Sequence, residues 1–276
     1  MLSLFFRQTN IVWLFFTSCI SFMYSNSPTG QAIRGVDREI LAIEIKPWRK
    51  YFWEEVASVG IHLLYRLFLD IASLKYIFSY TFPLFSCAGA FLIFLKVNGS
   101  IVLGDKDAHT AVFNPAQLLY FSLFTCIFAL PCFLANLVDV LKFFYRNILK
   151  LLVLSVLSYL IIANFDVVHP YNLADNRHFC FYAWRYLHKY RTFLAPVYGA
   201  SILGVTYLLP RSFLWNFAFW LCTAASVVPQ KLFEFRYFMV PFTIVLLFSQ
   251  KLSYKLQILW NLLLLATWVY FFRRKK

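Results

Sequence analysis

Long runs of apolar residues, separated by short polar connectors, dominate the pattern of this chain. Eight of them approach the length of about 20 residues with which a helix crosses the hydrocarbon core of a bilayer. They lie at roughly 9–25, 76–96, 116–137, 148–165, 193–209, 212–229, 237–249 and 256–272. The runs show no two-residue alternation, so they predict helices rather than the strands of a barrel. We therefore expect an all-α polytopic membrane protein with about eight transmembrane helices, forming a single domain over residues 1–276.

The longest polar stretch, 26–75, has an amphipathic pattern from Trp48 onward. Its apolar residues fall close to one helical face: Phe52, Val56, Leu63, Leu67, Ile71 and Leu74. Three polar residues, His62, Arg66 and Asp70, follow each other at i+4 on another face. This pattern predicts a helix that lies in the membrane interface, with a solvated polar stripe.

The distribution of Lys and Arg predicts the orientation of the helices. One set of connectors holds 13 such residues: 26–75, 138–150, 210–211 and 250–255. The other set holds 7: 97–114, 166–192 and 230–236. The positive-inside rule places the first set in the cytosol and makes the second set luminal loops. The sequon Asn98-Gly99-Ser100 then lies in the lumen. Eight spans also place the basic tail 273–276 in the lumen, so either the last two segments are not both full spans or the tail is an exception to the rule.

Composition supports lipid as the solvent of this chain. Of its 276 residues 61% are hydrophobic and 14% are charged, whereas soluble domains carry about 25% charged residues. The net charge of +14 comes from Lys and Arg in the connectors, so we expect contact with the lipid bilayer and no binding of nucleic acid. The six cysteines form no CxxC pair, and we expect neither a disulfide framework nor a metal site.

The residues that could bind a substrate or take part in a reaction lie on the predicted luminal side. These candidates are Arg7, Asp105, His109, His169, Asp175, Arg177, His178, Lys231, Glu234 and Arg236. The basic side chains suit a phosphate, which Arg binds through two parallel hydrogen bonds, and the carboxylates suit sugar hydroxyls. A phosphorylated lipid and a sugar are therefore the ligands that this chemistry favours. Two plainer interpretations stay open: each segment is a hydrated connector, and Lys231 with Glu234 is an i,i+3 helical pair.

Four motifs along the chain together resemble one family. They are Phe6-Arg7-Gln8-Thr9-Asn10-Ile11; Val97-Asn98-Gly99 with Gly104-Asp105-Lys106 and His109; Leu173-Ala174-Asp175-Asn176-Arg177-His178 with Phe181-Tyr182 and Trp184; and Val228-Pro229-Gln230-Lys231-Leu232 with Glu234-Phe235-Arg236-Tyr237-Phe238 and Pro241. In order and spacing they resemble the dolichyl-phosphate-glucose α-1,2-glucosyltransferases over nearly the whole chain. The sequence departs from the family at Pro115-Ala116-Gln117, where the family has Pro-Gln, and at Asn172, which replaces an apolar residue.

The resemblance implies a multi-pass enzyme of the endoplasmic-reticulum membrane, of which this chain matches the C-terminal part of a GT-C-type glycosyltransferase. It implies transfer of glucose from dolichyl phosphate glucose to the dolichyl-diphosphate oligosaccharide Glc2Man9GlcNAc2-PP-dolichol, in α-1,2 linkage and with inversion, for protein N-glycosylation. No cofactor beyond this donor substrate is implied. In this interpretation Arg177, Lys231 and Arg236 bind the phosphate, and Asp175 and His178 support them.

The resemblance also bears on the catalytic base. Family members are longer at the N-terminus, where an early luminal loop carries acidic residues thought to include the base. We therefore expect an N-terminally truncated chain whose catalytic residue lies in the missing region, with its activity alone left open. The alternative is a non-catalytic membrane regulator or assembly protein that retains the fold. A transporter is disfavoured because the polar clusters lie at the ends of the spans and not near the middle of the bilayer.

Overall fold

The computed structural model describes residues 10–26, 53, 56–57, 60–61, 64, 71–99, 112–166, 181, 185, 188–210, 212–249 and 253–273. Within these residues all regular secondary structure is helical, which confirms the predicted all-α class. The chain divides into two compact units. Unit 1 comprises Met1–Thr110 and Arg211–Ser226, and unit 2 comprises Ala111–Pro210 and Val227–Lys276. The prediction of a single transmembrane domain over 1–276 stays a prediction.

Each of the eight predicted apolar runs contains a helix. These helices are α2 (Asn10–Asn26), α5 (Ile71–Asn98), α6 (Ala116–Phe128), α9 (Ile148–Phe165), α12 (Ala195–Leu208), α13 (Phe213–Val227), α14 (Met239–Phe248) and α15 (Tyr254–Arg273). Helix α5 starts at Ile71, so the end of the stretch predicted as the loop 26–75 is helical. The rest of the predicted interfacial helix lies mostly outside the described residues.

Helix α9 is the clearest candidate for a membrane span in the described part of the chain. It alone there is both long and apolar enough to cross a bilayer by itself, with 18 residues. Six further apolar helical segments of 10–17 residues are shorter than this. The apolar residues of α9 point mostly outward: Leu149 is 75% exposed and Val156 is 60% exposed. Such a continuous exposed apolar surface is unusual for a protein dissolved in water.

Unit 1 is held together by aromatic side chains of α2 and α13. Phe16 on α2 meets Trp215 on α13 edge to face, with ring centroids 5.4 Å apart. Trp13 approaches Phe219 at 6.4 Å. All four rings are buried, and α5 packs against α2 on a further side. Pairs of this geometry add about 0.5–1.5 kcal/mol each beyond the area that they bury.

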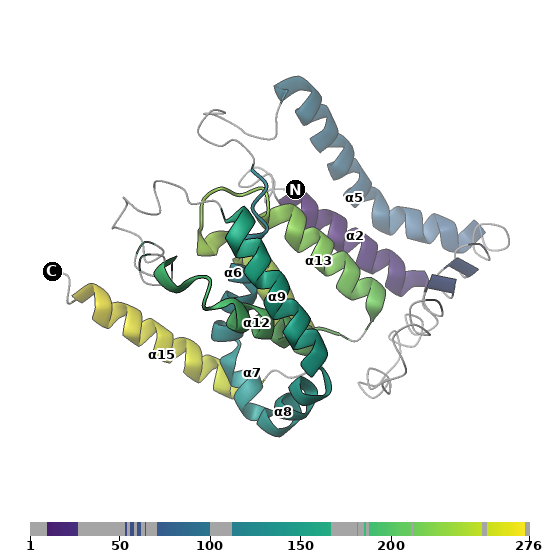
Figure 1. Ribbon diagram of the computed structural model, residues 1–276. Coiled ribbons are helices and arrows are strands. Elements are labelled where there is room, and N and C mark those ends of the chain that lie inside the picture. The colour runs from purple at the N-terminus through teal and green to yellow at the C-terminus, as the bar shows by residue number, and fades with distance from the viewer. Residues whose placement is uncertain are drawn as a thin grey trace. The chain divides into compact units, whose positions relative to one another are not determined.

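Helix α12 is the central helix of unit 2, and it packs against α9 and α6 (Figure 1). Small residues on α12 allow this close approach. A Cβ atom at Gly199 would lie 2.7 Å from the backbone nitrogen and the hydroxyl oxygen of Ser155 on α9. A Cβ atom at Gly204 would lie 2.9 Å from Sγ of Cys126 on α6. Small residues at such crossings are typical of helix packing in membranes.

The contact at Gly199 leads to a first testable expectation. Gly199→Ala should lower the stability of unit 2 by about 1–3 kcal/mol, because the added methyl meets the backbone of Ser155 and the helices must separate. Thermal unfolding in detergent measures the change. Gly89→Ala is the matched control, because nothing lies within 4 Å of a Cβ at Gly89 on α5. An equal midpoint for the two variants would contradict the packing described for α12.

The run 116–137 is not one continuous helix, as the sequence pattern predicts, but breaks after α6. Pro131 has no N–H, so the carbonyl of Ile127 loses its helical partner. This carbonyl accepts a hydrogen bond from Nε1 of Trp260 on α15, at 3.1 Å. The next carbonyl, that of Phe128, accepts one from Nε2 of Gln257 at 2.8 Å. Two side chains of α15 thus satisfy the carbonyl groups that the break leaves without helical partners.

Two short helices follow the break: α7 (Leu130–Ala135) and α8 (Leu137–Arg146). Helix α8 lies in the stretch 138–150 that the sequence pattern predicts as a connector. Its ends are formed by Asn136 and Asn147, whose side-chain amides each donate to a carbonyl four residues earlier, at 2.9 and 2.8 Å. The connector between α7 and α9 is therefore a structured helix.

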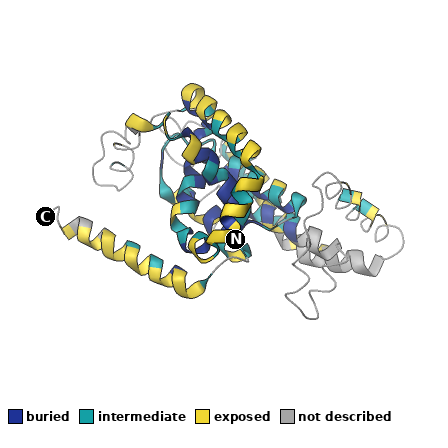
Figure 2. Cartoon of the chain, turned by 60° about the horizontal axis from the view of Figure 1, so that its bottom comes forward, coloured by how far each residue is buried: buried dark blue, intermediate teal, exposed yellow. Residues whose placement is uncertain are grey.

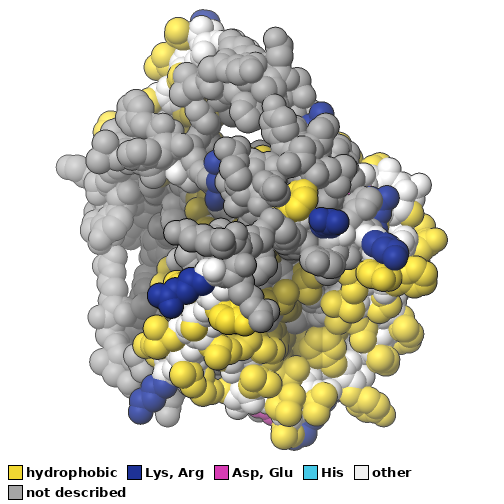
Figure 3. All heavy atoms as spheres, turned by 90° about the vertical axis from the view of Figure 1, so that its left-hand side faces the viewer, with side chains coloured by type: hydrophobic (Ala, Val, Ile, Leu, Met, Phe, Trp, Pro, Cys, Tyr) yellow, Lys and Arg dark blue, Asp and Glu magenta, His cyan; other side chains and the backbone are white. Residues whose placement is uncertain are grey.

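The last helix, α15, is exposed along most of its length (Figure 2). Its exposed side chains are mainly apolar and include Leu259, at 64%, and Leu262, at 57%. Hydrophobic side chains also dominate the described surface in Figure 3, with Lys and Arg scattered between them. The exposed helical faces of this protein thus have the composition of a surface that faces lipid.

Candidate functional site

The three predicted luminal loops are described mainly at their ends. Seven of the ten predicted site residues lie outside the described residues: Arg7, Asp105, His109, His169, Asp175, Arg177 and His178. The other three, Lys231, Glu234 and Arg236, lie in the connector between α13 and α14. The described C-terminal end of the first loop, residues 112–114, and the described residues of the second and third loops belong to unit 2, so their arrangement can be compared directly.

The end of the first loop pairs with the start of the third. The backbone N–H of Val112 donates to the carbonyl of Pro229 at 3.2 Å, and that of Asn114 donates to the carbonyl of Val228 at 3.1 Å. Neither stretch is helical, so these bonds replace the ones that a helix would make internally. Residues 114 and 117 sequence positions apart are thereby fixed side by side.

The third loop is also fixed to the first turn of α6. Nε2 of Gln117 donates to the carbonyls of Gln230 and Leu232, both at 3.2 Å. The Gln117 side chain is buried, with 1% of the residue exposed. Gln117 belongs to the Pro115-Ala116-Gln117 sequence that departs from the family pattern. Its amide holds the segment from which Lys231 projects.

We expect Gln117→Leu to destabilise this connection. The substitution removes two hydrogen bonds to partly buried carbonyls, which should lower the stability of unit 2 by about 1–3 kcal/mol. Hydrogen exchange at residues 228–234, read by mass spectrometry, should rise in the variant. Asn164→Leu is the control, because the exposed amide of Asn164 bonds only to the carbonyl of Leu160 in its own helix. Unchanged exchange in Gln117→Leu would show that the amide does not hold the loop.

A buried ion pair joins the two ends of the second loop. Asp166 caps the C-terminus of α9, and Arg191 lies just before α12. Nη1 of Arg191 lies 2.7 Å from Oδ2 of Asp166, whose side chain is 1% exposed. The hydroxyl of Tyr120 on α6 donates to Oδ1 of the same carboxylate at 2.9 Å. Asp166, Arg191 and Tyr120, hereafter the loop clamp, thus bring both ends of residues 167–190 to α6.

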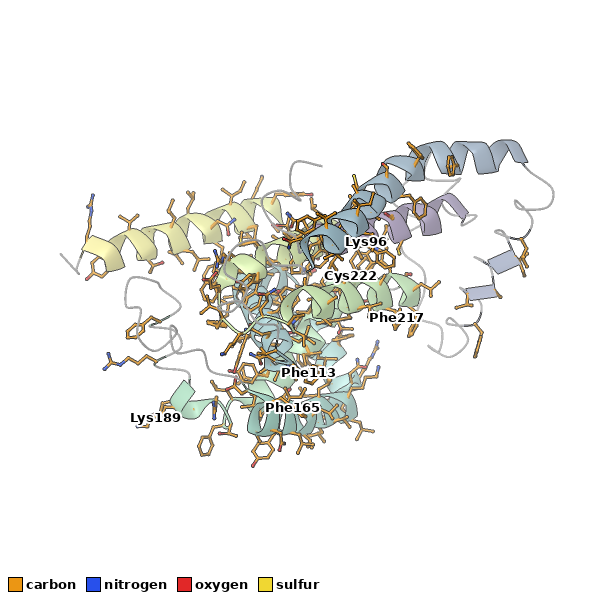
Figure 4. The ribbon with its side chains drawn as sticks, turned by 90° about the horizontal axis from the view of Figure 1, so that it is seen from above. Lys96, Phe113, Phe165, Lys189, Phe217 and Cys222 are labelled. Carbon is orange, nitrogen blue, oxygen red and sulfur yellow. The ribbon has the colours of Figure 1, made fainter. Side chains whose placement is uncertain are left out.

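Aromatic contacts connect the loop clamp to the third loop. The ring of Tyr120 lies 5.4 Å from that of Phe233 and 5.7 Å from that of Tyr198 on α12, both edge to face. Phe233 is buried, although it stands between the exposed ends of the third loop. Phe113, in the first loop, meets Phe165, the residue before Asp166, with ring centroids 5.7 Å apart (Figure 4). The ends of all three loops therefore gather at one end of unit 2.

The charged side chains of the third loop have different environments. Arg236 forms an ion pair with Glu234 through Nε, and its guanidinium lies 5.3 Å from the ring centre of Tyr237. Lys231 is half-buried, and no ion pair among the described side chains includes it. The i,i+3 helical pair of Lys231 with Glu234 is wrong, because residues 228–234 are not helical and Glu234 binds Arg236 instead.

This end of unit 2 has the chemistry of an anion site with hydroxyl acceptors beside it. Arg236 and Lys231 offer positive charge, with Arg236 55% exposed along its side chain. Lys189, on the short helix η2 (His188–Tyr190), extends away from the helices (Figure 4). Over the described ranges, no three His, Cys, Asp or Glu side chains come together as metal ligands would. The arrangement suits a ligand that carries a phosphate.

The loop clamp is the part of the site that the sequence analysis missed. Asp166 and Arg191 are 25 residues apart, so no local motif joins them. A signal is nevertheless present, because Asp166 directly follows the apolar run 148–165 and Arg191 directly precedes the run 193–209. Opposite charges at the two ends of one loop between two spans indicate a pair that closes the loop.

Comparison with known proteins gives a consistent result. A sequence model described as the DIE2/ALG10 family matches residues 1–247. Three similar proteins are all named Dol-P-Glc:Glc(2)Man(9)GlcNAc(2)-PP-Dol alpha-1,2-glucosyltransferase. That of Rattus norvegicus is 33% identical, with 87% of this chain and 51% of the relative aligned. That of Homo sapiens is 32% identical with the same coverage, and that of Arabidopsis thaliana is 31% identical over 90% of this chain and 57% of the relative.

The chain thus spans about half the length of the curated relatives that it matches. No solved structure matches it.

Proposed function

The chain belongs to the DIE2/ALG10 family, and from this premise we propose that it transfers glucose from dolichyl phosphate glucose to Glc2Man9GlcNAc2-PP-dolichol. The names of the related proteins state this donor, this acceptor and the α-1,2 linkage. Because the donor is β-linked and the product α-linked, the transfer inverts the anomeric centre. Both substrates are anchored in the membrane by dolichol, so the protein must hold two lipid-borne groups at one surface.

The observation that carries this proposal is the gathering of the three loop ends in unit 2. The backbone bonds of Val112 and Asn114 join the first loop to the third. The loop clamp closes the second loop, and Phe233 joins the clamp to the third. Polar segments from three parts of the sequence therefore start from one place. A transferase that positions a sugar phosphate against an acceptor hydroxyl needs such a shared surface.

We assign the roles of the site residues according to their charge. Lys231 and Arg236, together with Arg177 in the second loop, bind the phosphate of the donor and stabilise it as it leaves. Asp175 and His178 support them. Asp105 and Glu234 accept hydrogen bonds from sugar hydroxyls, while Arg7, His109 and His169 bind sugar hydroxyls or the same anion. A base removes the proton from the acceptor 2-hydroxyl while the dolichyl phosphate departs from the opposite face of the sugar. We assign no residue of this chain to the base.

We place the protein in the membrane of the endoplasmic reticulum as a multi-pass protein with a GT-C-type fold. Helix α9 is long and apolar enough to span, and the outward faces of α9 and α15 carry leucines and other apolar side chains. The eight apolar helical runs correspond to eight spans. In this topology the gathered loop ends face the lumen, and the opposite end of α9, at Ile148, lies on the cytosolic side.

The transfer itself tests the proposal. The chain is expressed from its own gene, with all the coding sequence that the gene carries, in cells that lack the endogenous α-1,2-glucosyltransferase. Microsomes from these cells receive dolichyl phosphate glucose, and the released oligosaccharides are analysed by mass spectrometry. We expect the lipid-linked oligosaccharide to gain one hexose in α-1,2 linkage.

The same assay separates the enzyme from a non-catalytic member of the family. Membranes that contain the chain in amounts equal to an active relative, yet add no hexose, would favour a regulator or assembly protein that retains the fold. The active relative, expressed in the same cells, shows that donor and acceptor are both present.

A further inference from the structure

Helix α8 has three distinct faces. One face packs on unit 2: Val140 is buried, and the ring of Phe143 lies 5.2 Å from that of Tyr207 on α12. A second face is apolar but exposed, and a third is charged. Since 3.6 residues form a turn, Leu137, Val138, Leu141 and Tyr145 fall within one arc of about 100°, next to the arc of Lys142 and Arg146. An ordinary surface helix has only a buried and a polar face.

The exposed apolar face is not covered by any other part of the structure that is described. Val138 is 64% exposed, Leu141 is 61% exposed and Tyr145 is 82% exposed. Leu149, at the start of α9 and four residues after Tyr145 in the sequence, is exposed too. Exposed apolar residues thus continue along the sequence from α8 into α9, which in the described part of the chain is the one helix long and apolar enough to span a bilayer.

The charged face carries a row of basic residues. Lys142, Arg146 and Lys150 follow each other at i+4, from α8 into the first turn of α9, and all three are exposed. Asp139 is the one acidic residue between Leu137 and Lys150. Among the described residues no ion pair includes any of the three cations. Three basic side chains without acidic partners beside an apolar face complement a surface of acidic headgroups.

The position of α8 fits such a surface. Helix α8 precedes the start of α9, whereas the loop clamp lies at the end of α9 (Figure 1). The 18 residues of α9 separate these two ends by about 27 Å. This length is close to the hydrocarbon thickness of a bilayer, about 30 Å. Helix α8 is therefore placed at the membrane surface opposite to the candidate site.

We propose that α8 lies in the headgroup layer on the cytosolic side and binds anionic phospholipids through Lys142, Arg146 and Lys150. The inference rests on the membrane embedding proposed above but not on the transfer activity. Leu137, Val138, Leu141 and Tyr145 enter the boundary of the acyl chains, while the basic row contacts phosphate and carboxylate groups of the lipids. The helix thereby fixes the depth of α9 and of unit 2 in the bilayer.

Lipid selectivity of the full chain tests this proposal. The protein is purified in detergent and titrated with phosphatidylserine or phosphatidylcholine, and bound lipid is counted by native mass spectrometry. We expect tighter binding of phosphatidylserine. Each basic residue contributes about 1 kcal/mol to such binding, equivalent to about fivefold in affinity. The triple variant Lys142→Gln/Arg146→Gln/Lys150→Gln should therefore bind phosphatidylserine roughly a hundredfold more weakly.

A second triple variant controls for net charge. Lys96→Gln/Arg185→Gln/Arg273→Gln removes three exposed positive charges that lie outside α8 and outside the candidate site, and it should bind phosphatidylserine as the parent chain does. Equal losses in both triple variants, or equal binding of the two lipids by the parent chain, would overturn the proposal. Thermal unfolding of each variant confirms that the exposed substitutions leave the fold intact. Because no donor or acceptor is present, failure here is distinct from failure of the glucosyl transfer.

Discussion

Replacing Arg191 by Leu is expected to destabilise unit 2 by about 3 kcal/mol, the largest effect of any single substitution considered for stability. The carboxylate of Asp166 is 1% exposed and has two partners, the guanidinium of Arg191 and the hydroxyl of Tyr120. Removing the guanidinium leaves a buried negative charge with only a neutral donor. We take the lower end of the usual range because the Arg191 side chain is 32% exposed.

Removing the charge of Asp166 instead of that of Arg191 should lower the stability of unit 2 by less. Asp166→Asn leaves Arg191, which reaches water, and keeps an oxygen that accepts the hydrogen bond of Tyr120. We expect a loss of about 1–2 kcal/mol. The double variant Asp166→Asn/Arg191→Leu should be no less stable than Arg191→Leu alone, because no buried charge remains without a partner. Tyr120→Phe should cost about 1 kcal/mol by removing one hydrogen bond.

Unfolding in detergent by a denaturing detergent or by heat measures these differences. Arg185→Leu is the control, since Arg185 is exposed and its loss should change stability by no more than about 0.5 kcal/mol. Equal stability of Arg191→Leu and Arg185→Leu would show that the loop clamp contributes nothing. A double variant that is less stable than Arg191→Leu would show that charge burial is not the cause.

Glucosyl transfer should fall by about two orders of magnitude when a phosphate-binding side chain is removed. Preorganised donors that stabilise developing negative charge are each worth about 10²–10³ in rate. We expect this effect for Arg177→Ala and Lys231→Ala. Lys231 is half-buried and has no acidic partner among the described residues, so its charge is available to the departing dolichyl phosphate.

Arg236→Ala should act in a different way because Glu234 is its partner. The substitution removes a positive charge and also leaves Glu234 close to the phosphate, where the two negative charges repel. Glu234→Gln/Arg236→Ala should therefore transfer glucose faster than Arg236→Ala. Initial rates in microsomes at equal protein amounts give the comparison, with Lys255→Ala as an exposed control outside the site. Unchanged rates in both Arg177→Ala and Arg236→Ala would contradict the phosphate assignment.

Hydrophobic runs predict the helices of this protein well, because each run of the sequence needs an apolar surrounding over its whole length. Every predicted run contains a helix, from α2 to α15. The break after Phe128 also has a local cause that sequence contains, since Pro131 cannot donate to Ile127. The side chains that donate hydrogen bonds to the carbonyls freed by the break are distant in the sequence. Trp260 and Gln257 lie about 130 residues further on.

Helix α8 shows where a polarity pattern misleads. Lys142 and Arg146 indicate a connector if charge alone is considered, but their i+4 spacing beside Leu141 and Tyr145 is that of a helix with one apolar arc. Sequence analysis predicts an interfacial helix in 26–75 by the same argument. The described part of the chain has an amphipathic helix in 137–146.

The candidate site likewise has features that a local sequence pattern predicts and features that depend on distant contacts. Charged motifs indicate which loops carry the chemistry, because Lys231, Glu234 and Arg236 lie close together in the sequence. The residues that gather the loops are apolar or distant: Phe233, Gln117 and the Asp166–Arg191 pair. Their role depends on side-chain contacts between segments more than 20 residues apart, and a pattern along one segment does not contain these contacts.

Accessibility labelling in sealed microsomes tests most directly whether the three polar loops share one water-facing surface. Single cysteines replace Lys106, Arg177, Lys231 or Lys142 in a chain that carries Cys180→Ser, and a membrane-impermeant maleimide is added before or after the membrane is permeabilised. We expect positions 106, 177 and 231 to react only after permeabilisation, and position 142 to react in sealed vesicles. Labelling that places 106, 177 and 231 on different sides of the bilayer would contradict the shared luminal site and the proposed transfer with it.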